Sequence, residues 1–353
     1  MAIERLELTN FTAFDYLNIE FSPGINIFIG KNGTGKTMLL KLLYSVLYSE
    51  GQVIGGQGPL FETILPKKEG SLETKLIGVF LPHQGRLGRL VKRSKVSSTA
   101  EIRIYSNGKP LTFTFSNHSL SDAKVQRRRK WTKQDLGTPV YIPVKEMLAH
   151  GPGLRSLYKS RLIHFPEIYI DILDLAYLPS LRGRIDASRE KLLGLIRRTI
   201  SGKVEREDEF FFLRMQRGKI EFPLVAEGMR KLALIWLLIQ NGTLLEGSTL
   251  FWDEPEANLN PELMRTVIDI LLELQRNGIQ IFLASHSYVV LKLFDLLKKE
   301  SDSIAFHSLF SKRKGHIACN STKDYLRIDP NAISDTYANL YDEDIERALK
   351  RSK

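Results

Sequence analysis

The sequence contains one cysteine in 353 residues, at position Cys319. It therefore excludes a framework of internal disulfides and is typical of proteins kept in a reducing compartment. Long apolar runs are also missing. The longest, residues 232–239, is too short to cross a bilayer, and charges near the start stand where a signal peptide would need an apolar stretch. We therefore expect a soluble, cytoplasmic protein with no membrane partner.

No internal repeat and no long heptad run is visible, which excludes solenoid architectures and an extended coiled coil. Positive charge, by contrast, is abundant, and the formal net charge is +11. This balance favours anionic partners such as a nucleotide, DNA or RNA. A generally basic surface is the alternative, and net charge alone does not separate the two.

The densest basic cluster is residues 126–131, which contain three arginines, a lysine and, at the end, Trp131. The cations would bind a phosphate backbone while Trp131 stacks on a base. The alternative is a solvated charged face, which is the commoner use of such a run.

The glycine-rich stretch of residues 30–37 matches the pattern G-x-x-x-x-G-K-[ST] at every fixed position. It reads Gly30, Lys31, Asn32, Gly33, Thr34, Gly35, Lys36 and Thr37. A β-branched and aromatic run precedes it, and leucines at helical spacing follow it. In this context the backbone N–H groups would surround phosphates, Lys36 would reach the β- and γ-phosphates, and Thr37 would ligate Mg²⁺. A glycine-rich turn with a solvated lysine is the alternative.

Two acids, Asp253 and Glu254, end an apolar strand that the sequence predicts over residues 249–254. Asp253 would hold Mg²⁺ through water, and Glu254 would orient and deprotonate the attacking water. His286 ends the next predicted strand, where it could donate a hydrogen bond to the γ-phosphate and contact the same water. Alone, an Asp-Glu pair at a strand end is often just a turn, and a single histidine is often just a satisfied polar residue. Their order after a phosphate-binding loop favours the functional role.

The rest of the chain alternates between strand and helix patterns. The acidic triplet of residues 342–344 is expected to begin a helix. The predicted elements are an antiparallel start over 3–21, a surface loop over 50–70, strands at 74–81, 101–105, 111–115 and 139–143, a turn at 107–108, helices between 154 and 204, a hairpin over 210–222, and helices at 229–241 and 261–277.

Residues 28–37, 251–260 and 284–287 resemble the ABC-type ATPase superfamily, in particular ATP-binding proteins related to the OLD, RecF and SMC heads. The opening Leu-Glu-Leu-Thr-Asn-Phe of residues 6–11 is similar to that branch as well. The resemblance implies an α/β fold of the P-loop NTPase class, an ABC-type ATPase head in which a mixed sheet core carries an antiparallel β lobe and a helical lobe.

The resemblance covers residues 1 to about 50 and about 220 to 310. We therefore expect a head over 1–310, interrupted by a divergent insertion at about 51–222, and a C-terminal extension over 311–353. Within the insertion, an antiparallel β part is expected at 72–116 and a helical part at 154–204.

Residues 224–231 stand where the family carries its ABC signature. In the family this segment comes from a second subunit and caps the γ-phosphate, so that ATP joins two heads in a head-to-tail dimer. The resemblance therefore implies nucleotide contacts for Ala226, Glu227 and Gly228. Ala226 replaces the usual serine and loses one hydrogen bond, on the order of 1 to 3 kcal/mol if buried against charge.

Two further loops of the family have candidate positions in this sequence. Residues 255–260 occupy the D-loop position, which implies a nucleotide contact for Asn258. For the Q-loop, Lys145 and Glu146 after the strand at 139–143 are favoured by position, and Gln84 is the alternative by residue type.

OLD nucleases continue into a Toprim domain and SMC proteins insert a long coiled coil, and neither pattern is visible here. The resemblance thus implies an ATPase that uses ATP and Mg²⁺, forms a homodimer or higher oligomer, and acts with a separate effector such as a nuclease or toxin, or with DNA. It further suggests prokaryotic antiphage defence or DNA maintenance.

An alternative is an ATP-gated clamp or sensor of nucleic acid with little turnover. A third hypothesis, a transporter motor subunit, lacks its usual signature and Q-loop glutamine.

Overall fold

The computed structural model describes residues 2–54, 71–121, 126–129, 131–132, 135–183, 186–312 and 315–351. Within them, six strands form a central sheet in the order β14-β13-β3-β12-β11-β7. The strands are β3 (Ile25–Ile29), β7 (Pro139–Ile142), β11 (Thr249–Asp253), β12 (Gln280–Ala284), β13 (Ile304–Ser311) and β14 (Ile317–Thr322).

All neighbours in this sheet pair in parallel except β13 and β14, which pair antiparallel at one edge. Every residue of β3, β7, β11 and β12 is buried. Continuous burial is typical of parallel strands covered on both faces, and it explains their unbroken apolar sequence. The strands predicted at 139–143 and 249–254 are confirmed.

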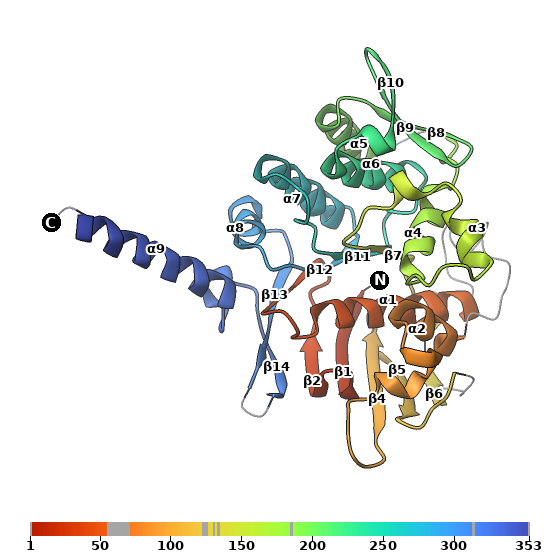
Figure 1. Cartoon of the computed structure of the whole chain (residues 1–353), viewed down its shortest axis with the longest axis vertical. Helices are drawn as coiled ribbons and strands as arrows, with labels where there is room; N and C mark the ends of the chain where they lie inside the picture. Colours follow the sequence, from red (N-terminus) through yellow and green to blue (C-terminus); the bar gives the residue numbers. More distant parts are fainter. Residues whose placement is uncertain are drawn as a thin grey trace.

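Helices cover both faces of the central sheet (Figure 1). The long helix α1 (Lys36–Ile54) contacts β7, β11 and β12 between this sheet and the antiparallel one. On the other side lie four helices that Figure 1 shows above the sheet. They are α5 (Ala187–Thr199), α6 (Glu227–Gln240), α7 (Pro261–Arg276) and α8 (Tyr288–Leu297).

A second, antiparallel sheet has the order β2-β1-β4-β5-β6. Its strands are β1 (Ile3–Phe11), β2 (Phe14–Glu20), β4 (Thr99–Ser106), β5 (Lys109–Ser116) and β6 (Gln126–Arg129). The turn between β4 and β5 has Asn107 and Gly108 at φ angles of 49° and 67°, so the predicted hairpin is confirmed. Because β4 pairs with β1, the strands after residue 98 extend the N-terminal hairpin.

The strand predicted over residues 74–81 is wrong, because α2 (Leu72–Phe80) occupies this segment. Ser71 caps the helix by accepting a hydrogen bond from the Thr74 N–H. Leu72, Leu76 and Val79 recur at helical spacing on its buried side. The antiparallel part predicted for 72–116 therefore begins at Thr99.

The loop predicted over residues 50–70 begins later than expected, because α1 continues to Ile54. The remainder of that loop, residues 55–70, lies outside the described residues. The division into a head over 1–310, an insertion at 51–222 and an extension at 311–353 stays a prediction. Strand pairing crosses its borders, since β7 joins β11 and β14 joins β13.

The helices predicted between residues 154 and 204 are present as α3 (Leu154–Lys159), α4 (Ile168–Ala176) and α5. The predicted hairpin, β9 (Phe210–Met215) and β10 (Gly218–Glu221), gains β8 (Lys203–Glu207) as a third strand.

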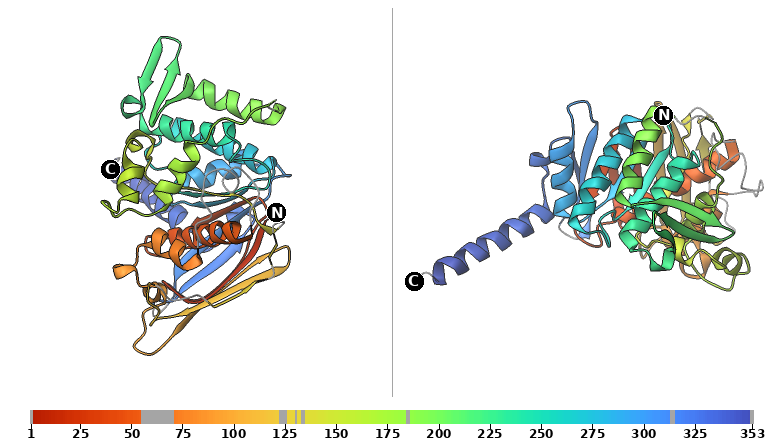
Figure 2. Two further views of the ribbon diagram at one scale, coloured as in Figure 1. Left: turned by 90° about the vertical axis from the view of Figure 1, so that its right-hand side faces the viewer. Right: turned by 90° about the horizontal axis from the view of Figure 1, so that it is seen from above.

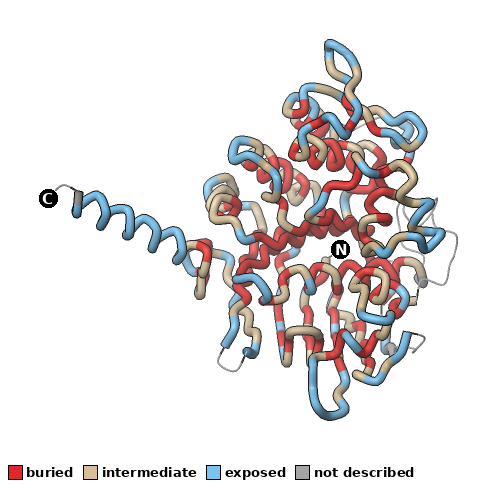
Figure 3. The backbone as a smooth tube through the Cα atoms, viewed as in Figure 1, coloured by how far each residue is buried: buried red, intermediate tan, exposed pale blue. Residues whose placement is uncertain are grey.

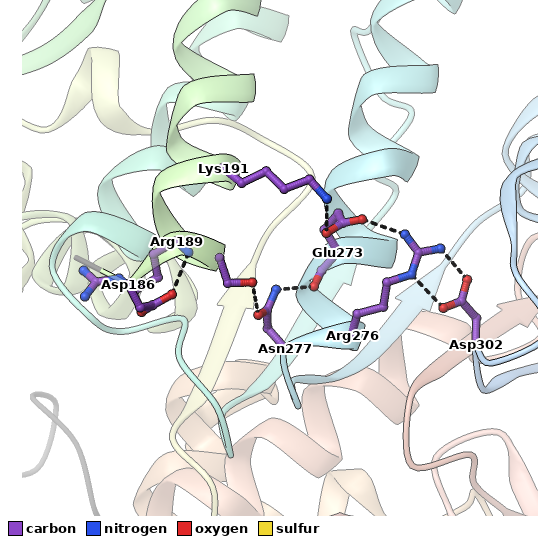
Figure 4. A network of polar contacts seen from close by, with 8 residues as sticks. Asp186, Arg189, Lys191, Glu273, Arg276, Asn277 and Asp302 are labelled. Atoms are coloured by element: carbon purple, nitrogen blue, oxygen red, sulfur yellow. Dashed lines mark hydrogen bonds and ion pairs between the residues drawn. The ribbon is translucent and has the colours of Figure 1, made fainter.

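Ion pairs attach α5 to α7 (Figure 4). Lys191 Nζ lies 2.9 Å from Glu273 Oε2, and Glu273 also pairs with Arg276 at 2.7 Å. Arg276 in turn binds Asp302 at 2.6 Å. The helical lobe, which consists of α5 and the strands β8 to β10 that follow it, is thereby attached to α7 (Figure 2).

The last element, α9 (Ala332–Arg351), extends away from the rest of the molecule (Figures 1 and 2). It begins after Asn331, whose side chain accepts a hydrogen bond from the Ser334 N–H at 3.1 Å. The acidic triplet at 342–344, expected to begin a helix, therefore lies in the middle of one, because the capping residue lies upstream. None of the described helices combines the length and the apolar composition needed to cross a bilayer.

Candidate functional site

The glycine-rich loop leaves β3 at the C-terminal end of that strand and enters α1. Gly30 and Gly35 have φ angles of 143° and 92°, values that side chains rarely allow. A Cβ on Gly30 would lie 2.2 Å from the Leu309 carbonyl oxygen, and one on Gly35 would lie 2.5 Å from Phe14 Cζ. Neighbouring strands therefore determine the tight course of the loop as much as its own sequence does.

Lys36 lies across the inside of this loop. Its Nζ donates hydrogen bonds to the carbonyl oxygens of Gly30 at 2.6 Å and Lys31 at 3.3 Å. Burial lowers the pKa of Lys36, while the nearby charges of Glu254 and Asp253 oppose that shift. The ammonium group is thus held beside the loop backbone, where phosphate oxygens are its natural acceptors.

Thr37 and Asp253 bring two oxygens together at the same place. The Thr37 hydroxyl donates to Asp253 Oδ1 at 3.0 Å, joining the start of α1 to the end of β11. A hydroxyl and a carboxylate are the oxygen ligands that Mg²⁺ prefers, so Thr37 would ligate the ion and Asp253 would hold it through a bound water. The pair therefore fits Mg²⁺. In the described part of the chain, this place included, no group of three or more His, Cys, Asp or Glu side chains gathers as a metal site.

Burial raises the pKa of Asp253 to about 6, and the charge of Glu254 adds to that effect. The hydrogen bond from Thr37 and a longer one from the Tyr141 hydroxyl, at 3.4 Å, oppose it. Tyr141 lies on β7, the strand beside β11, and sequence reasoning did not identify it. A divalent cation would favour the ionised carboxylate in this desolvated position.

Glu254 and His286 lie at the ends of adjacent strands, since Asp253 pairs with Ala284 across β11 and β12. Glu254 has a φ angle of 49°, and its N–H donates to the Ala284 carbonyl at 2.9 Å. His286 Nδ1 lies 3.5 Å from Glu254 Oε1. The structure thus brings together the two residues that the sequence placed at successive strand ends.

Glu256 is a further residue of this group that sequence reasoning missed. Its Oε1 accepts hydrogen bonds from the Ser285 hydroxyl at 2.8 Å and from the His286 N–H at 2.9 Å. The same oxygen lies 3.6 Å from His286 Nδ1. Its only sequence signal is a carboxylate two residues after Glu254, which says nothing about contact with β12.

The predicted signature residues meet the predicted D-loop within one chain. Asn258 Nδ2 donates to Glu227 Oε1 at 2.8 Å, and a Cβ on Gly228 would lie 2.8 Å from a methyl group of Leu259. Ala226 is the N-cap of α6 and makes no side-chain cap. Among the described residues, no hydrogen bond or ion pair joins this group to residues 30–37, so the two halves of the predicted site share no polar contact within one chain.

The Q-loop residue stays a prediction. Ile142 pairs with Trp252, so the chain after β7 emerges beside Asp253, as expected of residues 145 and 146. The Glu146 carboxylate is buried and bound to Arg230 Nε of α6 at 2.7 Å, whereas Lys145 is exposed. Gln84 is exposed in a short turn after α2.

The proposed stacking role of Trp131 is wrong. Its side chain is only 5% exposed, and its indole N–H donates to the Lys109 carbonyl at 2.8 Å. The ring belongs to the hydrophobic core, and its hydrogen bond joins it to the start of β5. Arg128 on β6 is exposed, and Lys130 lies outside the described residues.

Residues 25–292 match the model of the family described as "AAA domain, putative AbiEii toxin, Type IV TA system". The DNA replication and repair protein RecF of Lysinibacillus sphaericus (strain C3-41) is 29% identical over 149 residues, 40% of each chain. RecF of Lactococcus lactis subsp. lactis (strain IL1403) is 21% identical over 228 residues, 64% of this chain and 62% of the relative. The chain thus spans between 40% and 62% of the length of these two relatives.

Among solved structures, the SmcHead bound to the C-winged helix domain of ScpA superposes with a TM-score of 0.55 at 14% identity. The match covers 92% of this chain and 98% of that one. The likeness establishes the fold, an α/β P-loop architecture of the ABC-type ATPase head.

Proposed function

Because the chain belongs to the AAA-domain family that its residues 25–292 match, we propose that it binds Mg·ATP and hydrolyses it. The observation that carries the proposal is the 3.0 Å contact between Thr37 and Asp253 beside the glycine-rich loop, with Glu254 next in the chain. A phosphate cradle, two oxygen ligands for Mg²⁺ and a carboxylate close to them are the parts that ATP hydrolysis requires.

Binding would begin at the loop of residues 30–37. Its backbone N–H groups and the N-terminus of α1 attract the phosphates. Lys36 would exchange its bonds to the carbonyls of Gly30 and Lys31 for the β- and γ-phosphate oxygens. Thr37 and Asp253 would hold Mg²⁺, which supplies positive charge to stabilise the transferring phosphate.

In the hydrolytic step, water attacks the γ-phosphorus while the bond to the leaving ADP oxygen breaks. Glu254 accepts the proton that water releases, and the products are ADP and phosphate. His286 Nδ1 faces the carboxylates of Glu254 and Glu256, which leaves Nε2 as the ring nitrogen that would face the γ-phosphate. The histidine would thus orient both the water and the group it attacks.

Dimerisation is part of the same proposal. Ala226 and Asn258 are exposed at the start of α6 and in the loop before α7. In a pair of copies, residues 226–228 and Asn258 of one copy would cover the nucleotide that is bound to residues 30–37 of the other copy. This arrangement accounts for the separation of the two halves within one chain, since each ATP would lie between two heads.

The test is ATP turnover by Glu254→Gln, which keeps the side-chain volume and removes the base. We expect steady-state hydrolysis to fall about 10² to 10⁴-fold, the usual contribution of general base catalysis. ATP binding, measured by isothermal titration, should persist. Lys36→Ala is the matched control and should lose binding together with ATP-dependent pairing. Sustained hydrolysis by Glu254→Gln at the native rate would remove Glu254 as the base.

The cycle would act on something outside the chain. We place the protein in the cytoplasm and propose that it works with a separate effector, such as a nuclease or toxin, or with DNA. The relatives named DNA replication and repair protein support a DNA setting. If the effector is a nuclease or a toxin, the proposed setting is antiphage defence.

A second candidate function is an ATP-gated clamp or sensor of nucleic acid with little turnover, which the net charge of +11 favours. Titration of a labelled duplex, with and without ATP at several salt concentrations, separates the two. Binding whose affinity falls steeply with salt and rises with ATP would support the clamp. Absence of binding at low salt would remove it.

A further inference from the structure

The apolar side chains of α9 are unusually exposed. Leu340, Tyr341, Ile345 and Leu349 are between 55% and 67% exposed. Near its beginning the helix packs on α8, where the ring of Tyr337 lies 4.8 Å from that of Tyr288. Figure 3 shows the remainder of α9 as exposed.

The spacing of these side chains makes them one surface. Positions 337, 341, 345 and 349 follow one another at intervals of four, so they form a stripe along one side of the helix. Contiguous apolar surface of this kind on a folded protein marks an interaction site. Apolar residues at every fourth position also form the contact face of helices that bind in a groove on a partner protein.

Charge indicates what this helix binds. Over its whole length, Ala332–Arg351, it carries five acids, at 335, 342, 343, 344 and 346, and three bases, at 347, 350 and 351, which is a net charge of −2, although the chain as a whole has a net charge of +11. Pairing of α9 with α9 would therefore gather like charges. An antiparallel pair that aligns Tyr341 with Ile345 places the acids at 342–344 of both copies together, and a parallel pair places each acid beside itself. A basic surface is the better partner.

The chain offers such a surface on its helical lobe. A groove of about 1270 Å³ lies between the C-terminal half of α5 and the β9–β10 hairpin. Six cationic side chains line it, with Met215 and Ile220 as apolar members and Glu190 as the one acid. The cations are Arg197, Arg198, Lys203, Arg214, Arg217 and Lys219.

Most of this positive charge is available to a partner. Arg214 and Lys219 pair with Glu205 and Glu207 on β8. The other four cations make no ion pair with any acid in the part of the chain that the structure describes. The wall formed by α5 is held in place, because Lys191 binds Glu273 of α7 at 2.9 Å (Figure 4).

We propose that α9 of one copy binds in the α5–hairpin groove of a second copy. The acids of α9 would meet the free arginines, and its apolar stripe would cover Met215 and Ile220. A helix of 20 residues is about 30 Å long. It leaves the body beside α8 and points away from α5 and the β9–β10 hairpin (Figures 1 and 2). Because these elements line its own groove, the groove it enters belongs to a second copy. This contact needs no nucleotide and is distinct from pairing through ATP.

The test is a charge exchange measured without nucleotide. The full chain and two reversed variants, Asp342→Lys/Glu346→Lys and Arg197→Glu/Arg198→Glu, are compared by light scattering over a range of protein concentrations. Each variant alone should associate at least tenfold more weakly than the native chain. A mixture of the two variants should recover association, because the new lysines then face the new glutamates.

Controls separate this contact from other causes. Arg93→Glu/Lys95→Glu makes the same change of charge on exposed residues far from the groove in sequence and should associate like the native chain. Glu254→Gln should also associate normally, so failure of the ATPase proposal would leave this result unchanged. Three outcomes would overturn the inference: a native chain that stays monomeric, association unaffected by the groove variant, or no recovery in the mixture. Circular dichroism of each variant verifies that it is folded.

Discussion

Single side chains hold the loop that carries His286. One carboxylate, that of Glu256, accepts from the Ser285 hydroxyl and the His286 N–H, and it also faces the imidazole. Beside it, Lys231 of α6 donates a hydrogen bond to the Ala257 carbonyl. The end of β12 and the loop after β11 are therefore joined by charge-assisted bonds at the point where hydrolysis is proposed to occur.

Glu256→Gln tests whether that charge positions His286. Glutamine keeps the volume and one accepting oxygen but removes the negative charge, and a charge-assisted bond is stronger than a neutral one by about 1 kcal/mol. We expect kcat for ATP hydrolysis to fall about tenfold while KM for ATP changes little. Steady-state kinetics across pH measures both. The exposed Glu262→Gln in the first turn of α7 is the control, and equal kcat for Glu256→Gln and the native chain would contradict the role.

At this scale the sequence predicted the residues whose signal is local. Gly30, Lys36 and Thr37 follow from a fixed spacing within one loop, and Glu254 follows Asp253 directly. Glu256 and Tyr141 could not be predicted, because their importance depends on which strands are neighbours. The error over Trp131 has a similar cause, since neighbouring charges say nothing of whether a ring is buried.

Among the elements, α2 shows how a helix with a strand-like pattern is held in the core. Lys75 is buried between α1 and α4, with Nζ 2.6 Å from Asp171 Oδ2 and 3.0 Å from Glu167 Oε1. The ammonium group also lies 3.5 Å from the ring centre of Tyr48. Burial raises the pKa of Glu167, and the charge of Lys75 opposes that shift. The cluster thus joins three helices through one cation.

Removal of that cation should destabilise the protein strongly. Lys75→Met keeps the length of the side chain but leaves Asp171 as a buried carboxylate without a cation, which costs about 3 to 5 kcal/mol in comparable cases. The free energy of unfolding, measured with urea, should fall by about that amount. Lys75→Met/Asp171→Asn should recover part of the loss, because the unpaired charge is gone. A single variant as stable as the native chain would show that the cluster contributes nothing.

The elements that the sequence predicted well have a long run of apolar residues at a regular spacing or a clear capping residue. Asn260 and Pro261 begin α7 as expected, and the Asn260 side chain accepts from the Leu263 N–H at 2.8 Å. The strand predicted over α2 failed because its apolar residues fit both periods, and the choice depended on packing against α1. The beginning of α9 was missed because the acidic triplet at 342–344 was interpreted as a helix start, whereas the helix begins after Asn331.

In the whole molecule, segments far apart in the sequence complete the two larger sheets. β4 pairs with β1 across more than 80 residues, and β7 joins β11 across a similar span. Such pairings leave no local pattern, so the sequence predicted the strands but not their order. The clustering of positive charge in the basic groove could likewise not be predicted from the sequence, because the groove is formed by two separate elements, α5 and the β9–β10 hairpin.

Global stability should depend on pH through His307 on β13. This side chain is fully buried, with Nε2 3.1 Å from Asn26 Oδ1 and Nδ1 2.8 Å from the Ser321 hydroxyl. Burial lowers the pKa of His307 to about 3, from an ordinary value of 6.5. The folded protein therefore keeps the ring neutral at acidities where the unfolded chain protonates it.

The sign of the effect follows from that difference. A depressed pKa means that the unfolded chain binds more protons between pH 6.5 and 3, so stability is complete above pH 6.5 and is lost as the pH falls through this range. Between pH 7.5 and 5 the loss from this residue is about 2 kcal/mol. His307→Gln should therefore lose about 2 kcal/mol less than the native chain over the same interval in urea unfolding, whatever its stability at pH 7.5. The exposed His118→Gln is the matched control, and an unchanged dependence on pH in His307→Gln would mean that another group controls acid unfolding.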